Sequence, residues 1–159
     1  MSVEHEGFIR RSFEVARSAV ANGNHPFGAV FVLDGKIILE AENSVCINQD
    51  CTCHAELNLV KQVCKLPLES IQNGILYSST EPCCMCSGAI FWSGIKNVVY
   101  GMSEHHLPTL VGPSDTLEKL IMSLPCRNVF KQGQRTINVV GPILEEEAIA
   151  VHGNYWREK

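Results

Sequence analysis

The sequence predicts an α/β domain in which helices cover both faces of a mixed, five-stranded sheet. Two observations support this prediction. Apolar runs typical of buried strands alternate with helical segments along the chain, and the turn residues Asp34-Gly35 join the first two runs as a hairpin. The chain has 159 residues, shows no internal repeat and contains no linker-like stretch. We therefore expect a single domain over residues 1–159.

The N-terminal third predicts a helix followed by the hairpin. Apolar residues including Phe8 and Phe13 recur at helical spacing through the first 22 residues, and Asn22-Gly23-Asn24 ends this helix. Residues 27–33 form an apolar run that reads as a buried strand, and residues 36–41 return beside it. This pair is antiparallel, whereas the later strands are separated by helices and are expected to be parallel.

The remaining elements continue the alternation. In order, we expect a polar loop (42–52), a helix that begins near His54 and ends before Pro67, a strand (74–79), a helix (83–92), a strand (96–100), a weaker helix (115–123), a strand (136–140) and a last helix from Glu145. Pro82 suits the start of the second of these helices. The three glutamates that begin at Glu145 suit a helix N-terminus, where negative charge is stabilised.

Composition narrows the range of partners. Hydrophobic residues make up 45% of the chain, charged residues 19%, and the formal net charge is −4. A nucleic-acid backbone binds to positive surface, so a nucleic-acid partner is disfavoured, although a local basic patch would still permit one. No apolar stretch is long enough to span a membrane.

The eight cysteines bear on the expected compartment. Charged residues, among them Glu4, Glu6 and Arg10, interrupt any apolar signal sequence at the start of the chain. We therefore expect a cytoplasmic, reduced protein, in which cysteines bind metal, take part in catalysis or are simply buried.

Two short motifs carry the chemistry. His54-Ala55-Glu56 is an H-x-E segment, and Pro82-Cys83-Cys84-Met85-Cys86 is a P-C-x-x-C segment. Together they form the pattern typical of zinc-dependent base deaminases. His54, Cys83 and Cys86 are the expected Zn²⁺ ligands, which leaves the fourth position free for water. Both segments open helices, where the positive end of the helix lowers the pKa of a thiol and so favours the thiolates that zinc requires.

Glu56 is the expected catalytic acid and base. It lies two residues after His54, and in the first turn of a helix both side chains can reach one pocket. There Glu56 would take a proton from the zinc-activated water and pass it to the departing ammonia.

Two other uses of these cysteines remain open at this point. A closed structural zinc site would need a fourth ligand, which Cys84, Cys51 or Cys53 would supply. Alternatively, Cys83 and Cys86 would act as a redox pair. The joint presence of both motifs, each opening a helix, favours the deaminase interpretation.

The chain resembles the cytidine/deoxycytidylate deaminase superfamily, within the branch of guanine deaminases and tRNA adenosine deaminases. The resemblance covers about residues 8–101. It rests on Pro26-Phe27-Gly28-Ala29-Val30, Asn43, the two zinc motifs, Gly88-Ala89-Ile90 and Val98-Val99-Tyr100-Gly101. It implies a three-layer α/β/α fold, one zinc per subunit, and a homodimer or larger assembly.

The resemblance also implies roles for substrate-binding residues. Phe27 would pack on the substrate ring, and Asn43 would hydrogen-bond its edge or an attached sugar. Trp92 would stack on the base, either within its own subunit or across a subunit interface. Asp115 is the candidate for the acidic residue that guanine deaminases use to recognise the base, and capping of a helix is its alternative role.

A purine-type base or nucleoside is therefore the expected substrate, with guanine first because Phe91-Trp92 matches the guanine deaminases. Adenosine in tRNA, a cytosine-type base, and a non-enzymatic zinc protein are the alternatives. His105 and His106 are expected to face solvent or to edge the pocket. Tyr155 and Trp156, close to the C-terminus, predict a tail that is tied down, either as a lid over the pocket or by packing alone.

Overall fold

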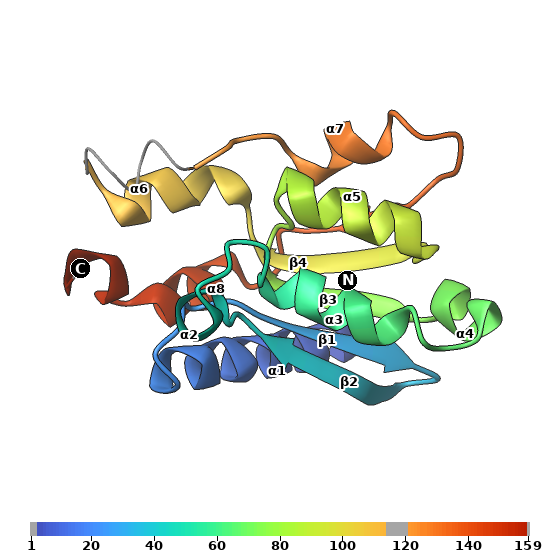
Figure 1. The fold of residues 1–159 in the computed structure, drawn as a ribbon, viewed down its shortest axis with the longest axis horizontal. Helices are drawn as coiled ribbons and strands as arrows, with labels where there is room; N and C mark the ends of the chain where they lie inside the picture. Colours follow the sequence, from blue (N-terminus) through green and yellow to red (C-terminus); the bar gives the residue numbers. More distant parts are fainter. Residues whose placement is uncertain (1–2, 114–120, 159) are drawn as a thin grey trace.

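The computed structural model describes residues 3–113 and 121–158 and contains one five-stranded mixed sheet (Figure 1). The strands lie in the order β2-β1-β3-β4-β5. They are β1 (Gly28–Leu33), β2 (Lys36–Glu42), β3 (Ile75–Thr80), β4 (Asn97–Met102) and β5 (Asn138–Val140). β1 pairs antiparallel with both β2 and β3, whereas β3–β4 and β4–β5 are parallel. The prediction of a mixed, five-stranded sheet is confirmed.

The helices lie between and after the strands. They are α1 (Val3–Ala21), α2 (Val45–Asn48), α3 (Ala55–Val63), α4 (Leu68–Asn73), α5 (Cys84–Ser93), α6 (Leu107–Val111), α7 (Cys126–Phe130) and α8 (Glu145–His152). Short 3-10 turns span Glu104–His106 and Tyr155–Glu158. None of the helices in the described part of the chain combines the length and the apolar character needed to cross a bilayer.

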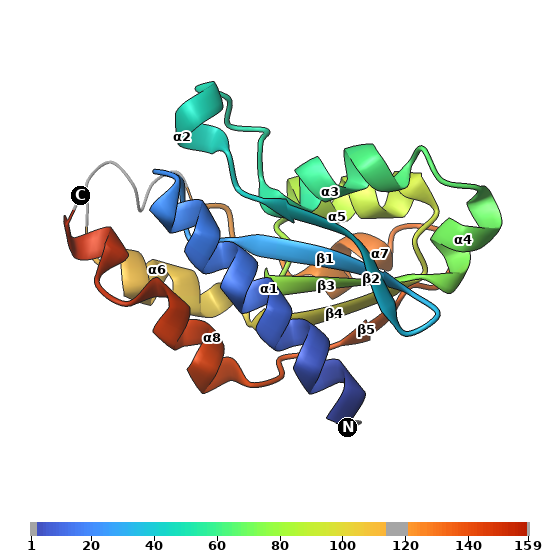
Figure 2. The ribbon, with the colours of Figure 1, turned by 90° about the horizontal axis from the view of Figure 1, so that it is seen from below.

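The sheet has a helical layer on each face, so the three-layer arrangement is confirmed. Helices α1 and α8 lie on one side, and α3, α5 and α7 lie on the other (Figure 2). The alternation of side chains along β1 explains how both layers pack. Ala29 and Phe31 join the core under α3 and α5, whereas Val30 and Val32 join the core under α1. This is why β1 reads in the sequence as an unbroken apolar run.

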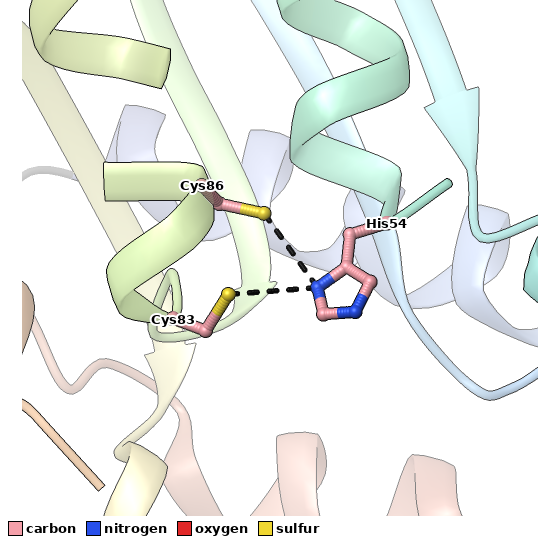
Figure 3. Close-up of side chains that lie close together, drawn as sticks. All are labelled: His54, Cys83 and Cys86. Carbon is pink, nitrogen blue, oxygen red and sulfur yellow. Dashed lines mark hydrogen bonds between the residues drawn. The ribbon is translucent and has the colours of Figure 1, made fainter. Parts of the chain in front are cut away.

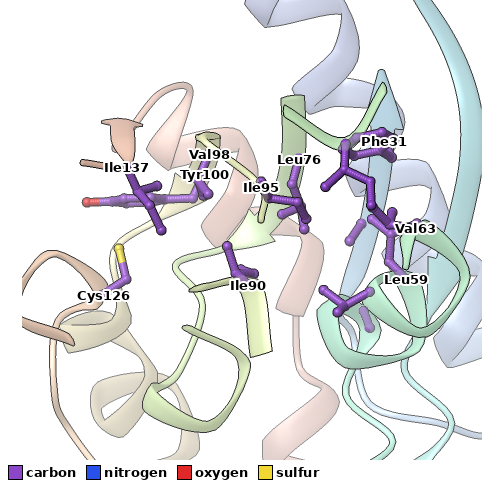
Figure 4. Close-up of a cluster of buried hydrophobic side chains, with 14 of the residues drawn as sticks. Phe31, Leu59, Val63, Leu76, Ile90, Ile95, Val98, Tyr100, Cys126 and Ile137 are labelled. Carbon is purple, nitrogen blue, oxygen red and sulfur yellow. The ribbon is translucent and has the colours of Figure 1, made fainter. Parts of the chain in front are cut away.

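The core beneath α3 and α5 fixes the position of these two helices (Figure 4). Leu59 and Val63 of α3 and Ile90 of α5 are fully buried against Leu76 of β3. Removing side chains of this size from water stabilises the fold by about 1.5–3 kcal/mol each. The N-termini of α3 and α5 are therefore held by packing that lies along the bodies of the helices.

The hairpin turn follows the sequence prediction. Asp34 and Gly35 both have positive φ, at 51° and 72°. This backbone matches a two-residue turn that suits the right-handed twist of the strands.

The structure corrects the expected helices in several places. The loop 42–52 contains the short helix α2, and Pro67 is followed by α4. The weaker helix expected over 115–123 falls largely outside the described residues, and residues 121–123 are not helical. The helix that the structure describes after residue 120 in this region is α7, which begins after Pro125. Helices of four to six residues are too short to show an apolar periodicity, so the sequence pattern missed them.

The contact between α1 and β1 yields a prediction about stability. A Cβ built at Gly28 would lie 2.5 Å from the backbone nitrogen of Ala16 and 2.5 Å from the carbonyl oxygen of Ser12. The Gly28→Ala variant must therefore push α1 away from the sheet, and we expect it to lose about 1–3 kcal/mol of unfolding free energy in urea titration. Gly7→Ala on the same helix meets no atom within 4 Å and should stabilise the protein slightly. Equal stability of the two variants would contradict this account of the contact.

Candidate functional site

The two sequence motifs meet at the N-termini of α3 and α5. His54 is the residue that immediately precedes α3, and Cys83 is the residue that immediately precedes α5. Cys86 lies in the first turn of α5, so its thiol faces the same space (Figure 3). The structure thus brings together the three side chains that the sequence singled out as metal ligands, from segments that are far apart along the chain.

The spacing of the three donor atoms fits zinc. His54 Nδ1 lies 3.5 Å from Cys83 Sγ and 3.6 Å from Cys86 Sγ, and all three donor atoms lie within 4.8 Å of one another. Tetrahedral zinc with ordinary Zn–N and Zn–S bonds places such atoms about 3.6 Å apart. One imidazole nitrogen and two thiols are also the donor types that zinc prefers. Among the described residues, this is the one cluster of His, Cys, Asp or Glu with metal-ligand spacing.

Two of the cysteines that could supply a fourth zinc ligand make other contacts. Cys84 Sγ lies 3.1 Å from Met122 Sδ, and Cys53 Sγ accepts a hydrogen bond from the Asn48 side chain. No fourth protein ligand joins the cluster within the part of the chain that the structure describes. The geometry therefore favours an open metal site of the catalytic kind over a closed structural one.

The electrostatics of the ligands favour one thiolate before metal binds. A hydrogen bond from Cys86, followed by the contact with His54, lowers the pKa of the Cys83 thiol to about 4. The neighbouring Cys83 and burial raise the pKa of Cys86 well above its ordinary value. The hydrogen bond to Cys83 raises the pKa of His54. Metal binding then releases protons, because zinc takes both sulfurs as thiolates and the imidazole as neutral.

Glu56 lies beside the ligands and is almost fully buried. Its Oε1 accepts a 2.9 Å hydrogen bond from the hydroxyl of Ser78 on β3, and its Oε2 lies 3.7 Å from Cys86 Sγ. Burial raises the pKa of the Glu56 carboxyl, which brings this group closer to neutral pH. A carboxyl group that is held in place and has a raised pKa is suited to accept and return a proton.

A small pocket opens in front of these groups. His54, Glu56 and Cys83 line it. Its apolar wall consists of Phe27, Leu107, Ile121 and Met122, and its remaining polar side chains are Thr80, Glu81 and Glu104. Of these residues beyond the motifs, the sequence analysis named Phe27 alone as a wall residue. Thr80, Glu104, Leu107 and Met122 carried no local signal, because they come together only when β3 and the segment after β4 fold around the site.

Glu81 has a structural role in this pocket. Its Oε1 accepts a hydrogen bond from the backbone N–H of Cys126, and its Oε2 accepts one from the N–H of Glu104. The Glu81 carboxylate thus ties the 3-10 turn Glu104–His106 and the start of α7 to the end of β3. Glu104 is half-buried, and burial, followed by the charge of Glu81, raises the pKa of its carboxyl group.

Of the other predicted substrate residues, Asn43 and Trp92 lie outside this wall in the single subunit. Asn43 is buried, and its Oδ1 accepts a hydrogen bond from the Val45 N–H, as in a turn-forming asparagine. Trp92 is 88% exposed at the end of α5. Asp115 lies outside the described residues. His105 is exposed, and His106 Nε2 lies 3.3 Å from a carboxylate oxygen of Glu145, so neither histidine edges the pocket.

The C-terminal tail is tied down, as the two terminal aromatics predicted, and it contacts the pocket residue Phe27. Trp156 Nε1 donates a 3.0 Å hydrogen bond to His152 Nδ1, and its ring stacks on His25 at 5.3 Å. Phe27 contacts both the ring of His152 and that of Trp156. Burial lowers the pKa of His152 to about 4, so its ring is neutral near pH 7. The tail therefore touches the pocket through Phe27.

The comparisons with known proteins now identify the family. Residues 2–102 match the model of the cytidine and deoxycytidylate deaminase zinc-binding region. The chain belongs to this family. It is therefore a Zn²⁺-dependent hydrolytic deaminase of the nucleobase and nucleoside class.

Three relatives show how widely the substrate varies among similar chains. A probable cytosine deaminase of Schizosaccharomyces pombe is 36% identical over 157 residues, 98% of this chain and 94% of the relative. A guanine deaminase of Bacillus subtilis is 44% identical over 105 residues, 65% of this chain and 67% of the relative. A tRNA-specific adenosine deaminase of B. subtilis is 30% identical over 156 residues, 98% and 90% of the two chains.

Among solved structures, a guanine deaminase from Nitrosomonas europaea aligns with a TM-score of 0.79 at 21% identity. The alignment covers 98% of this chain and 85% of that one. This similarity shows the fold.

The donor geometry yields a prediction about metal content. The His54→Ala variant removes the nitrogen that both thiols approach, so we expect it to lose zinc affinity by more than the roughly 10- to 100-fold that loss of an outer-sphere partner costs. Elemental analysis after dialysis against a weak chelator measures this loss. Cys64→Ser changes an exposed free thiol and should keep the zinc of the wild type. Retention of zinc by His54→Ala would show that the cluster does not hold the metal.

Proposed function

We propose that this protein deaminates a free purine-type base, with guanine as the leading substrate. The observation that carries this proposal is one pocket that combines the His54, Cys83 and Cys86 cluster with the buried carboxyl of Glu56 and an apolar wall. The family supports the reaction class, and the pocket wall supports a flat, uncharged ring.

The roles of the residues follow from their positions. His54, Cys83 and Cys86 would hold the zinc ion, which would act as a Lewis acid and lower the pKa of a water molecule, so that hydroxide becomes available to attack the amino-bearing carbon. Glu56 accepts a proton from that water and delivers it to the departing ammonia. Ser78 holds Oε1 of Glu56, so the carboxyl faces the reacting atoms in one orientation. Phe27 and the apolar wall exclude bulk water from the ring.

The charges of the wall support a neutral substrate. Its charged side chains beyond the metal ligands are Glu56, Glu81 and Glu104, and no Lys or Arg lies on the described wall. A nucleotide phosphate or an RNA backbone would need cationic partners. A net charge of −4 points the same way. A free base or nucleoside therefore fits this pocket better than a nucleotide or tRNA.

Guanine is supported over the other bases by three observations. The guanine deaminase of B. subtilis is 44% identical over the matched 105 residues. The pair Phe91-Trp92 resembles the aromatic-Trp pair of guanine deaminases. In addition, the Glu104 carboxyl offers an acceptor to ring N–H groups. Among guanine, cytosine and adenine, guanine alone carries an N–H directly beside its amino-bearing carbon.

Cytosine is the second candidate. It is favoured by the relative from S. pombe, whose similarity extends over 157 residues and so includes the region of the C-terminal tail. Ammonia release from a panel of guanine, cytosine, adenine, their nucleosides and a tRNA anticodon stem separates the candidates. Turnover of the tRNA substrate with inosine as product, and no turnover of free bases, would overturn the proposal.

A homodimer, a contribution of Trp92 across its interface and a cytoplasmic location also belong to this proposal. Trp92 has the exposure that a contact with a second subunit would cover. Mixing a Trp92→Ala chain with a Glu56→Ala chain tests the contribution, since each chain would supply the residue that the other lacks.

Glu56 provides the test of the mechanism. The Glu56→Gln variant keeps the shape of the side chain and loses the proton carrier, so we expect zinc content to stay and turnover to fall by at least about 100-fold. Steady-state ammonia release on the best substrate of the panel measures the effect. Glu69→Gln alters an exposed carboxylate on α4 and serves as the matched control. Near wild-type turnover by Glu56→Gln would rule this mechanism out.

The tail provides a second test, because Trp156 contacts Phe27 of the pocket wall and Tyr155 contacts the nearby His25. We propose that the tail closes the pocket against water. Deletion of residues 153–159 should then leave folding and zinc content intact but lower turnover by about tenfold or change substrate preference. Arg157→Ala changes an exposed side chain of the same tail and should leave the kinetics unchanged. Unaltered kinetics after the deletion would rule out a role of the tail as a lid. Loss of soluble protein would indicate that the tail contributes by packing alone.

A further inference from the structure

Thr80 is the last residue of strand β3 and lines the pocket that contains the metal-ligand cluster. Side chains two residues apart on a strand share a face, so Leu76, Ser78 and Thr80 point to the side of the sheet that carries α3 and α5. Leu76 packs in the core, and Ser78 donates its hydroxyl hydrogen bond to Glu56. Thr80 is the next residue of this row, and it lies on the wall of the pocket.

The hydroxyl of Thr80 stands apart from the other buried hydroxyls. Thr80 is 4% exposed, and its Oγ1 has no hydrogen-bond partner among the described residues. The buried hydroxyls of Ser12 and Ser87 each donate to a backbone carbonyl, of Ile9 and Pro82 respectively. Buried polar groups in native proteins are nearly always paired, so an exception on the wall of a binding pocket points to a ligand as the partner.

The chemistry of the wall indicates which ligand atom pairs with it. Glu81 and Glu104 present carboxylates, which accept hydrogen bonds, whereas a threonine hydroxyl can donate one. Thr80 carries the one side-chain hydroxyl on the described wall. A ring with a carbonyl oxygen beside an N–H offers one acceptor to Thr80 and one donor to Glu104. Guanine and cytosine contain this arrangement, and adenine does not.

We propose that Thr80 is a specificity-determining residue that donates its hydroxyl hydrogen bond to a ring carbonyl of the substrate. This inference rests on the proposed function and narrows it to bases that carry both an amino and an oxo group. The unpaired hydroxyl costs the free protein stability, and substrate binding satisfies it. Adenosine, with no ring carbonyl, leaves it unsatisfied.

The test compares bases with and without the carbonyl in variants with and without the hydroxyl. Thr80→Val keeps the shape and removes the hydroxyl, whereas Thr80→Ser keeps the hydroxyl. Inhibition or binding constants are measured for guanine and 2-aminopurine, and for cytosine and 4-aminopyrimidine, since the second base of each pair lacks the carbonyl. Thr80→Val should weaken the binding of the carbonyl-bearing base by about three- to tenfold and leave the binding of the base without the carbonyl unchanged. Thr80→Ser should bind both as the wild type does.

Stability gives an independent readout. Thr80→Val should keep its zinc and unfold at a temperature at least as high as the wild type, because it loses an unpaired buried hydroxyl. The control Ser12→Ala removes a paired hydroxyl on α1 and should lower the unfolding temperature with no change in any binding constant. Thr80→Ala serves as the hydroxyl-free variant if Thr80→Val does not fold.

The outcomes separate this inference from the proposed function. Equal binding of the carbonyl-bearing bases by Thr80→Val and wild type would overturn the role of Thr80, even if the enzyme turns guanine over. Binding without turnover, with a loss confined to carbonyl-bearing bases, would support Thr80 and refute the proposed function. If the wild type binds none of these bases, both are wrong.

Discussion

The packing of α3 against α5 on one face of the sheet is the constraint on which the site depends. Three donor atoms from two segments must approach to about 3.6 Å before zinc can bind them tetrahedrally. His54 precedes α3, and Cys83 precedes α5, so the relative position of the two helices sets these distances. The positions are held from below by Leu59, Val63 and Ile90 in the core. A shift of either helix would therefore change the distances between the three donor atoms.

Strand β3 supplies the polar side of the same arrangement. It lies in the middle of the sheet, where a strand is buried on both faces, yet it ends in Ser78, Ser79 and Thr80. Ser79 accepts a hydrogen bond from the Gly28 N–H, and Ser78 donates one to Glu56, so the first two hydroxyls are paired within the protein. Polar groups in such a position cost stability unless they are satisfied. These hydroxyls lie at the carboxyl end of a central strand, which is the place where ligands bind in open α/β sheets.

Much of the fold and the reactive end of the site could be predicted from the sequence, because both are encoded locally. The strands stand out as apolar runs, and each zinc motif opens its own helix, so spacing alone identifies His54, Glu56, Cys83 and Cys86. The short helices α2, α4, α6 and α7 escaped prediction because four to six residues give no periodicity. The wall residues Thr80, Glu104 and Met122 escaped it because only the folded chain brings β3 and the segment after β4 together. Asn43 and Trp92 show the converse. The family pattern marks them, but within one subunit the first turns the backbone and the second faces outward.

This division explains why the chemistry is easier to derive than the substrate. Activation of water requires only the metal ligands and one carboxyl group, and in this chain the candidate residues come from two contiguous motifs. The remaining side chains of the pocket wall come from outside the motifs. They lie at the end of β3 and in the segment after β4, and Phe27 on the wall contacts the tail. Because these side chains lie on other elements than the zinc ligands, we expect a single substitution on the wall to change the preferred base while the ligands stay in place. Under the proposed function the wall sets substrate preference, and the hydroxyl of Thr80 is the wall group that lacks a hydrogen-bond partner in the described structure.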